Sequence, residues 1–390
     1  MRCAGYMNVV EGIIASLKRE GEPDRVYSFV QGIMPEFERQ FDDRFGDIID
    51  AEEVIILPNK DITIHKKLGF DSSWCGSAGP AISWGDGHHR DLVKKLDEKY
   101  KQIDKDYFVH DGGSLVKHEM LMGHPHGFQV DGLLKTREMW EEWYEEYTVG
   151  EIADNHVDEF NKSLQLGIEH EFLVVPSVGL LMEPLIGSIG IDSIGKFARK
   201  DPQFLHTICE TIMISAYKKM DFLCKTDAPV IIIPDDCAYK GRPILSPTMY
   251  KEFIIPHLAK MIEKAHAVGK LVMMHSDGFI EPYYPLFIEI GLDAHESLEP
   301  VAGMDLKHCK EIYGDRLSLV GNMDSSRLLP YGTVEEVTAE VMKCLHDGAP
   351  GGGYMFSPCT DLTDSCKLDN AIVMMETYKK YRDYPINIPS

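Results

Sequence analysis

Two side chains that bind metals well stand two positions apart at the end of a short apolar run. The run Leu271–His275 ends in His275, and Asp277 follows it. Side chains at this spacing point to the same face of an extended chain, so both can reach one site. Cys359 follows another apolar run, Tyr354–Ser357. Histidine nitrogen, thiolate sulfur and carboxylate oxygen are the usual zinc ligands, and a catalytic zinc keeps one position open. The residues alone also fit a hydrogen-bonded core histidine and a buried cysteine.

A second set of polar residues follows the apolar run Val230–Pro234. Asp235 and Asp236 come directly after it. Neighbouring side chains of an extended chain point in opposite directions, so at most one of the two acids enters a shared pocket. We expect Asp236 to face the pocket as a catalytic residue, with Tyr239 beside it as a substrate contact. Asp235 then caps the next turn.

Three further residues have a functional and a structural interpretation. Asn322 follows the run Leu317–Val320 and either binds substrate or satisfies the loop backbone. Glu299, before Pro300, is a catalytic candidate that otherwise caps the following helix or hydrogen-bonds to His275. His124 lies in the irregular segment Gly-His-Pro-His and is a candidate substrate contact or a surface histidine.

Short apolar runs alternate with longer helix-period segments through the second half of the chain. The six runs are Glu171–Val175, Val230–Pro234, Leu271–His275, Ala294–Leu298, Leu317–Val320 and Tyr354–Ser357, and two more are Arg25–Val30 and Glu53–Leu57. Alternation of this kind predicts parallel strands with crossover helices, hence an α/β fold. Eight strands are the number that closes a (β/α)8 barrel, whose functional side chains lie at the carboxyl ends of the strands.

The segment from about 71 to 132 is rich in Gly, His and Trp and has weak periodicity. We interpret it as a lid-like insertion over the mouth of the barrel. The whole chain, 1–390, is then one barrel domain with an N-terminal extension. A doubly wound open sheet is the alternative, but no Gly-x-Gly-x-x-Gly motif follows a predicted strand.

Composition narrows the classes of partner. The formal net charge is 40 − 63 = −23, which disfavours nucleic acid and anionic membranes. The nine cysteines include no Cys-x-x-Cys pair, and the apolar runs are too short to cross a bilayer. No signal-peptide pattern opens the chain, so we expect a cytoplasmic protein with reduced thiols.

Several motifs of this chain resemble the uroporphyrinogen decarboxylase superfamily. They are Ser246-Pro247, His275-Ser276-Asp277-Gly278, Glu299-Pro300, Gly303-Met304-Asp305-Leu306, Gly321-Asn322-Met323-Asp324 and Gly352-Gly353-Tyr354. The resemblance covers roughly residues 7–60 and 165–385. It implies a (β/α)8 barrel and one of two activities, decarboxylation of a tetrapyrrole or methyl transfer to or from a corrinoid protein.

The loop after the first predicted strand distinguishes these two activities. The decarboxylases hold the carboxylates of their substrate with arginines in this loop, whereas residues 29–37 of this chain, Phe-Val-Gln-Gly-Ile-Met-Pro-Glu-Phe, contain none. Binding a polyanion without that clamp would leave its carboxylates unpaired. The resemblance therefore favours the methyltransferase branch.

The methyltransferases of this superfamily bind zinc through His-x-Cys and a later Cys. His275 and Cys359 match that pattern, and Asp277 stands where a thiolate would be. The resemblance thus implies Zn²⁺ at His275, Asp277 and Cys359, and a partner protein that carries the corrinoid (cobalamin). The implied reaction moves a methyl group between a small methylated compound (methyl ether, methylamine or methyl thiol) and that partner, as in an O-demethylase. The alternatives are a metal-free decarboxylase and a non-catalytic corrinoid- or tetrapyrrole-binding barrel.

Overall fold

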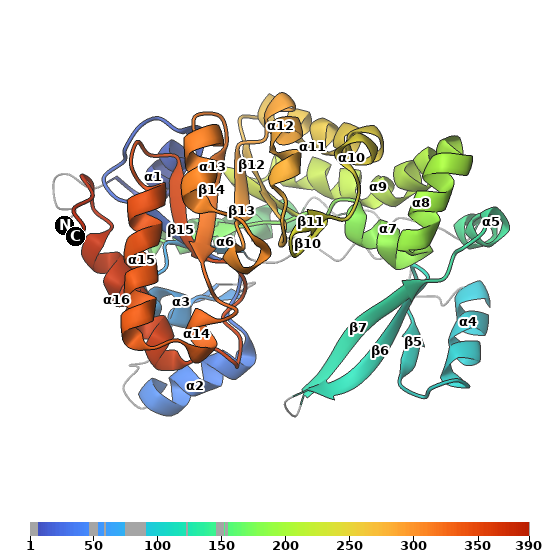
Figure 1. Cartoon of the computed structure of the whole chain (residues 1–390), viewed down its shortest axis with the longest axis horizontal. Helices are drawn as coiled ribbons and strands as arrows, with labels where there is room; N and C mark the ends of the chain where they lie inside the picture. Colours follow the sequence, from blue (N-terminus) through green and yellow to red (C-terminus); the bar gives the residue numbers. More distant parts are fainter. Residues whose placement is uncertain are drawn as a thin grey trace.

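The computed structural model describes residues 7–46, 54–57, 60–74, 91–121, 124–145, 152 and 155–389. Eight strands form one sheet in the order β8-β4-β1-β15-β14-β13-β12-β9, and all their pairings are parallel. The strands are β1 (Tyr27–Val30), β4 (Ser72–Trp74), β8 (Leu173–Val175), β9 (Val230–Pro234), β12 (Leu271–His275), β13 (Ala294–Ser297), β14 (Ser318–Met323) and β15 (Tyr354–Pro358). A parallel bridge between Ser177 and Ile232 brings the two end strands together. The predicted α/β barrel fold is confirmed (Figure 1).

Helices surround this sheet and connect its strands (Figure 1). They are α1 (Val9–Lys18), α2 (Pro35–Phe45), α3 (Thr63–Leu68), α6 (Asn155–Glu169), α7 (Met182–Ile189), α8 (Ile191–Lys200), α9 (Pro202–Lys225), α10 (Pro247–Phe253), α11 (Ile255–Ala267), α12 (Tyr284–Glu289), α13 (Leu306–Tyr313), α14 (Leu328–Tyr331), α15 (Val334–Gly348) and α16 (Leu368–Tyr381). Among the described residues, none of the helices has both the length and the apolar composition that crossing a bilayer would require.

One predicted strand is wrong. Of the described residues of the expected strand Glu53–Leu57, which are 54–57, Ile56–Leu57 (β2) are extended, and they pair antiparallel with Lys60–Asp61 (β3) outside the barrel. The barrel position belongs instead to β4, which lies between β1 and β8. Its serines are buried because they hydrogen-bond: the Ser72 hydroxyl donates to the Ser28 carbonyl at 2.8 Å.

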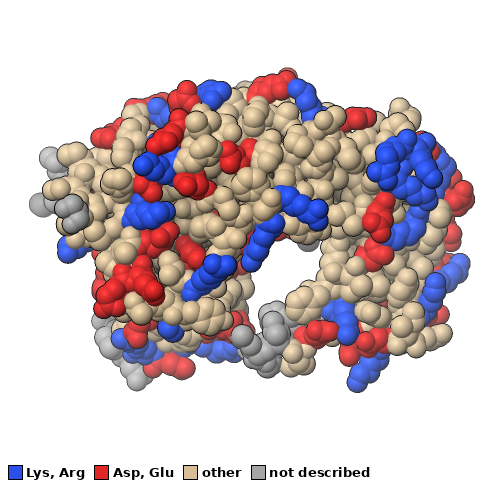
Figure 2. All heavy atoms as spheres, in the orientation of Figure 1, with Lys and Arg blue, Asp and Glu red and all other residues tan. Residues whose placement is uncertain are grey.

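The segment from about 71 to 132, which we expected to be an insertion, thus includes the barrel strand β4 near its start. The described part of the chain after β4 contains α4 (Asp91–Lys101) and an antiparallel sheet of β5 (Tyr107–Val109), β6 (Ser114–Leu121) and β7 (His124–Gly132), followed by α5 (Arg137–Glu145). The Leu134 amide donates to the Ser188 carbonyl at 2.9 Å, which anchors this segment on α7. Figure 2 shows an opening between this segment and the barrel.

The N-terminal helix α1 lies at the amino ends of the barrel strands. The Ser318 hydroxyl, at the start of β14, donates to the Leu17 carbonyl at 2.9 Å, and the Arg19 guanidinium donates to the Asp293 carbonyl at 2.8 Å. The extension therefore lies at the end of the barrel opposite the carboxyl ends of the strands.

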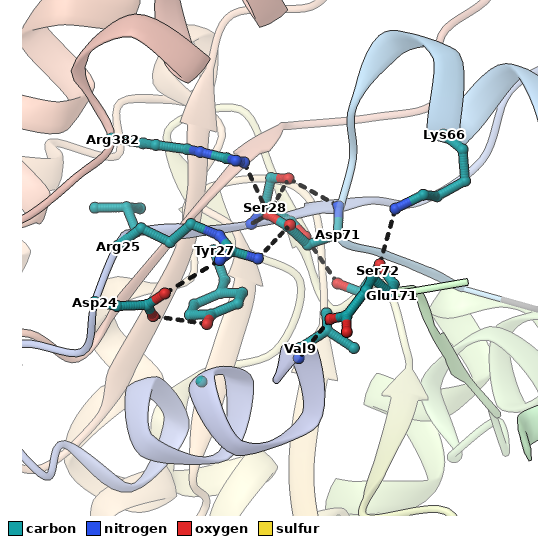
Figure 3. Close-up of polar contacts among 12 residues, drawn as sticks. Val9, Asp24, Arg25, Tyr27, Ser28, Lys66, Asp71, Ser72, Glu171 and Arg382 are labelled. Carbon is teal, nitrogen blue, oxygen red and sulfur yellow. Dashed lines mark hydrogen bonds and ion pairs between the residues drawn. The ribbon is translucent and has the colours of Figure 1, made fainter. Parts of the chain in front are cut away.

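A buried polar network joins distant parts of the chain near the start of β1 (Figure 3). The Asp71 carboxylate accepts hydrogen bonds from the Ser28 amide and hydroxyl, both at 2.9 Å, and from the Tyr378 hydroxyl at 2.9 Å. Arg25 lies 3.3 Å and Arg382 3.8 Å from the same carboxylate. This network ties β1, the start of β4 and α16 together.

Candidate metal centre at the mouth of the barrel

His275 is the last residue of β12, and its ring is buried at the carboxyl end of the barrel. Its Nδ1 atom lies 2.6 Å from Glu296 Oε2. β12 and β13 pair in parallel with His275 directly opposite Glu296, which brings the two side chains together. Burial opposes the charged imidazolium, but the Glu296 carboxylate outweighs it and raises the pKa of His275.

Asp236 and Asp277 complete a compact group with His275. One ligand atom from each of the three residues lies within 4.8 Å of those of the other two. The His275 Nε2 atom is 3.7 Å from Asp236 Oδ1, and the same oxygen accepts a hydrogen bond from the Asp277 amide at 2.9 Å. The Asp277 carboxylate accepts from the Ser297 hydroxyl at 2.7 Å, which fixes its direction.

This donor set fits a divalent cation. One imidazole nitrogen and two carboxylate oxygens are ligands that zinc accepts, and a bound histidine commonly gives its other ring nitrogen to a carboxylate. Glu296 occupies that supporting position on His275. Burial raises the pKa of Asp277, so a cation in this place would relieve an unfavourable buried charge.

Cys359 lies outside this compact group. Its side chain is buried, with the Sγ atom 3.7 Å from the Leu298 carbonyl oxygen. Burial, with Glu296 and Asp277 nearby, raises the pKa of the thiol well above its usual value. The sequence predicted Cys359 as the third ligand beside His275 and Asp277, whereas the compact group in the structure has Asp236 as its third member. The ligand role of Cys359 stays a prediction.

The two adjacent aspartates after β9 point different ways. The Asp235 carboxylate is buried and accepts a hydrogen bond from the Glu183 amide at 3.2 Å, in the first turn of α7. Asp236 is half-exposed and faces His275. Asp235 thus stabilises the start of α7, whereas Asp236 faces the candidate metal centre. The catalytic role of Asp236 stays a prediction.

Two further predicted site residues, Glu299 and Asn322, form hydrogen bonds to backbone groups. Glu299 accepts a hydrogen bond from the Gly278 amide at 3.1 Å, whereas the carboxylate beside His275 is that of Glu296; the catalytic role of Glu299 stays a prediction. The Asn322 side-chain amide is buried and donates to the carbonyls of Leu298 and Met304.

Tyr239 and His124 complete the set of predicted substrate contacts. Tyr239 lies in a short hairpin of β10 (Ala238–Tyr239) and β11 (Arg242–Pro243), half-exposed, and its carbonyl accepts from the Phe279 amide at 2.9 Å. This bond joins the hairpin to the loop after β12. The side chain of His124 lies outside the described part of the structure, and the substrate roles of both residues stay predictions.

Sequence reasoning missed several neighbours of His275. The Gln31 side-chain nitrogen lies 3.5 Å from His275 Nε2, and the ring centres of Trp74 and His275 are 5.7 Å apart. Gln31 and Asp361 follow predicted strands, so their position was a usable signal. Trp74 ends β4, a strand whose sequence contains no apolar run.

The fold agrees with the comparison to known families. Residues 180–381, more than half of the 390, match the uroporphyrinogen decarboxylase (URO-D) family. The chain belongs to the uroporphyrinogen decarboxylase family.

Curated relatives include both activities of that family. A methylated-thiol–coenzyme M methyltransferase of Methanosarcina mazei is 24% identical over 180 residues, which cover 45% of this chain and 46% of the relative. A uroporphyrinogen decarboxylase of Pseudoalteromonas translucida is 26% identical over 202 residues (48% and 51%). A methylcobamide:CoM methyltransferase MtaA of Methanosarcina barkeri is 25% identical over 195 residues (48% and 55%). The matches thus span about half the length of these relatives.

One solved structure shares the fold along nearly the whole chain. A methyltransferase from Methanosarcina mazei superposes with a TM-score of 0.56 at 16% identity and covers 96% of this chain and 99% of its own. At this identity the likeness concerns the fold alone.

Proposed function

We propose that this chain is a metal-dependent methyltransferase that moves a methyl group between a small methylated compound and a corrinoid protein. The observation that carries the proposal is the group Asp236, His275 and Asp277 at the carboxyl end of the barrel, where enzymes of this fold place their chemistry. Two curated relatives named as methyltransferases support it.

The proposed metal is Zn²⁺, held by His275, Asp277 and Asp236, with Cys359 as the further ligand that the sequence indicates. When bound, such an ion acts as a Lewis acid that stabilises charge developing on the heteroatom that loses its methyl group. A site of oxygen and nitrogen ligands is harder than a thiolate site, which suits an oxygen or nitrogen leaving group.

Three side chains around the centre have supporting roles in the proposed reaction. Glu296 keeps Nδ1 of His275 hydrogen-bonded, which leaves Nε2 for the metal. Ser297 holds the Asp277 carboxylate in place. Asp236 lies half-exposed beside His275, so its carboxylate oxygen that does not bind the metal can position the substrate.

Glu299 does not belong to the compact group but supports the loop that carries Asp277. Its carboxylate holds the Gly278 amide in the loop that carries Asp277. Gly278 has φ of 90°, and a Cβ there would lie 2.6 Å from the Ala238 carbonyl oxygen, so this loop packs directly on the β10–β11 hairpin. Glu299 and this contact set where Asp277 stands.

The segment after Trp74 supplies the proposed cover of the mouth. Its sheet is anchored on α7, whose first turn is bound to Asp235, next to the centre. A partner that presents a corrinoid must reach the same carboxyl end of the barrel. The opening in Figure 2 lies between the barrel and this sheet, and we propose it as the approach.

Decarboxylation is the second candidate activity, because one curated relative is a uroporphyrinogen decarboxylase. The absence of arginine from residues 29–37 disfavours it, because a tetrapyrrole with many carboxylates needs cationic partners. Conversion of uroporphyrinogen by the metal-free protein would establish this alternative.

The test is methyl transfer to free cob(I)alamin. Zinc-loaded protein is mixed with candidate methyl ethers, methylamines and methyl thiols, and the cobalamin spectrum is followed. We expect transfer from at least one donor class, lost in His275→Ala and kept in the matched variant His346→Ala, whose ring is exposed. Equal transfer by both variants would contradict the proposed site.

A further inference from the structure

His295 lies in β13 beside Glu296, and its ring is buried against α12. Neighbouring side chains of a strand point in opposite directions, so Glu296 reaches His275 while His295 faces the surrounding helices. The Nε2 atom of His295 nevertheless lies 3.3 Å from the carbonyl oxygen of Ser276. Ser276 is the residue between the two candidate ligands His275 and Asp277. His295 therefore contacts the short segment that joins these ligands.

Two fixed partners determine which ring nitrogen of His295 carries the proton. The Tyr284 hydroxyl, in α12, lies 2.8 Å from Nδ1. Burial lowers the pKa of His295 to about 3, so the neutral ring offers one N–H and one lone pair. The Ser276 carbonyl can only accept a hydrogen bond, so Nε2 carries the proton and Nδ1 accepts from Tyr284. The hydroxyl thus holds the tautomer that donates to the segment between the ligands.

The carbonyl group that accepts from His295 belongs to the peptide bond between Ser276 and Asp277. The amide of the same peptide donates to Asp236 Oδ1 at 2.9 Å. The peptide unit is planar, so the directions of its C=O and N–H groups are fixed relative to each other. A hydrogen bond that holds the carbonyl therefore also aims the N–H at Asp236. One rigid unit links His295 to two members of the candidate metal centre, Asp236 and Asp277.

The other polar groups of Ser276 are held as well, and the residue is buried. Its amide donates to the Glu296 carbonyl at 3.1 Å, and its hydroxyl accepts from the Cys237 amide at 3.1 Å. If the Ser276 carbonyl turned away, the buried N–H of His295 would lose this acceptor. Leaving a buried donor without an acceptor is costly. The segment between the two ligands is therefore held in one conformation.

We propose that His295 is a positioning residue of the metal centre. Its Nε2–H fixes the Ser276–Asp277 peptide, and this peptide sets where the carboxylates of Asp277 and Asp236 stand. Tyr284 acts through His295 by holding the donating tautomer. Replacing a residue that orients metal ligands commonly lowers metal affinity by about 10–100-fold. The inference rests on the proposed function, because it concerns the metal centre of that function.

Two substitutions at this position separate the two hydrogen bonds of the ring. The side-chain amide of glutamine reaches as far as Nε2, so His295→Gln keeps a donor for the Ser276 carbonyl. The shorter asparagine reaches only as far as Nδ1, so His295→Asn keeps a partner for Tyr284 and loses the contact with Ser276. Competition with a chromophoric chelator measures the zinc affinity of each full-length variant. We expect His295→Asn to bind zinc about tenfold more weakly than the wild type, and His295→Gln to bind it nearly as tightly.

A merely structural role of His295 would not separate these variants, because both replace the ring by a smaller amide. Equal zinc affinity in folded His295→Asn and His295→Gln would therefore overturn the inference. The matched control is His257→Asn. His257 is likewise buried, with Nδ1 2.7 Å from the Tyr217 hydroxyl, and it contacts no member of the candidate metal centre among the described residues. This control should bind zinc as the wild type does.

The absorption spectrum of the Co²⁺ protein gives a second readout that reports ligand geometry. Its visible bands should change in His295→Asn, where the carboxylates of Asp236 and Asp277 are no longer held, and should match the wild type in His295→Gln. Identical bands in all three proteins would also overturn the inference.

Tyr284→Phe keeps the inference testable if His295→Asn does not fold. The variant removes only the hydroxyl that faces Nδ1 of His295. Without that donor the ring can carry its proton on Nδ1, which places a lone pair against the Ser276 carbonyl. We expect weaker zinc binding than in the wild type. Wild-type zinc affinity in folded Tyr284→Phe would overturn the inference.

Failure of this inference differs from failure of the proposed function. If the wild-type chain binds no zinc, both fail. If it binds zinc and the two His295 variants bind it equally, only the inference fails. If His295→Asn alone binds zinc weakly but no methyl compound gives transfer, the positioning role stands and the methyltransferase activity is wrong.

Discussion

The Nδ1 atom of His275 lies 2.6 Å from the carboxylate of Glu296, and both side chains are buried on neighbouring parallel strands. A carboxylate behind a metal-binding imidazole fixes the ring and increases its basicity. Asp236 Oδ1 lies 3.7 Å from Nε2 of the same ring, and Asp277 belongs to the same compact group. The His275–Glu296 pair therefore orients the imidazole so that it can bind a cation through its other nitrogen.

Replacement of Glu296 should weaken metal binding without removing a ligand. We expect Glu296→Gln to lower zinc affinity by about 10–100-fold, because the ring loses its supporting charge. A competition titration with a chromophoric chelator measures this change. Glu289→Gln is the matched control, since the Glu289 carboxylate is exposed and pairs with Lys251. The same loss in both variants would show that the effect is not specific to the His275 partner.

Cobalt substitution distinguishes the carboxylate ligands from the cysteine. If Asp236, His275 and Asp277 bind the ion alone, the Co²⁺ protein lacks the intense near-ultraviolet band of a thiolate ligand. Asp236→Ala should then lower metal affinity more than Cys359→Ser does. A strong thiolate band that disappears in Cys359→Ser would instead establish the ligand set indicated by the sequence.

The network around Asp71 should dominate the stability of the first strand. Asp71→Ala leaves the guanidinium groups of Arg25 and Arg382 without their shared carboxylate, so we expect a loss of about 3–5 kcal/mol in the free energy of unfolding (Figure 3). Denaturant unfolding measures it. Asp315→Ala, on an exposed pair with Arg316, should change stability by no more than about 0.5 kcal/mol.

His257 should make stability depend on pH between about 4 and 6.5. Burial lowers its pKa to about 4, below the ordinary value of 6.5, and its Nδ1 lies 2.7 Å from the Tyr217 hydroxyl. The unfolded chain therefore binds a proton that the folded chain rejects, so the stabilisation is present above pH 6.5 and is lost as the pH falls towards 4.

The variant His257→Gln tests this contribution. Its stability relative to the wild type should improve by about 2 kcal/mol when the pH falls from 7 to 5. Denaturant unfolding at both pH values gives the difference. A stability difference that stays constant between the two would contradict the lowered pKa.

Sequence patterns predicted the strands that are apolar on both faces. Val230–Pro234 and Leu271–His275 were predicted at their observed bounds, because central parallel strands are continuous apolar runs. Ser72–Trp74 escaped prediction because its buried serines are satisfied by hydrogen bonds that only the folded barrel supplies. The sheet β5–β7 escaped because it buries little: Met120 and Phe128 are exposed, which removes the apolar alternation.

The site was predicted in its residue types but not in its pairings. His275 and Asp277 share a face at a strand end, which local spacing reveals. The partner of His275 depends on the register of β12 against β13, which local sequence does not encode, so Glu296 was overlooked in favour of Glu299. The approach of Asp236 instead of Cys359 likewise depends on how the loops after β9 and β15 fold.

The most direct test of the central claim is the amount of metal that the purified protein binds. After incubation with zinc and removal of the excess, elemental analysis should give about one equivalent per chain in the wild type. It should give almost none in His275→Ala or Asp277→Ala, and one equivalent in His346→Ala. A wild-type protein that retains no zinc, or a His275→Ala variant that retains as much as the wild type, would contradict the account.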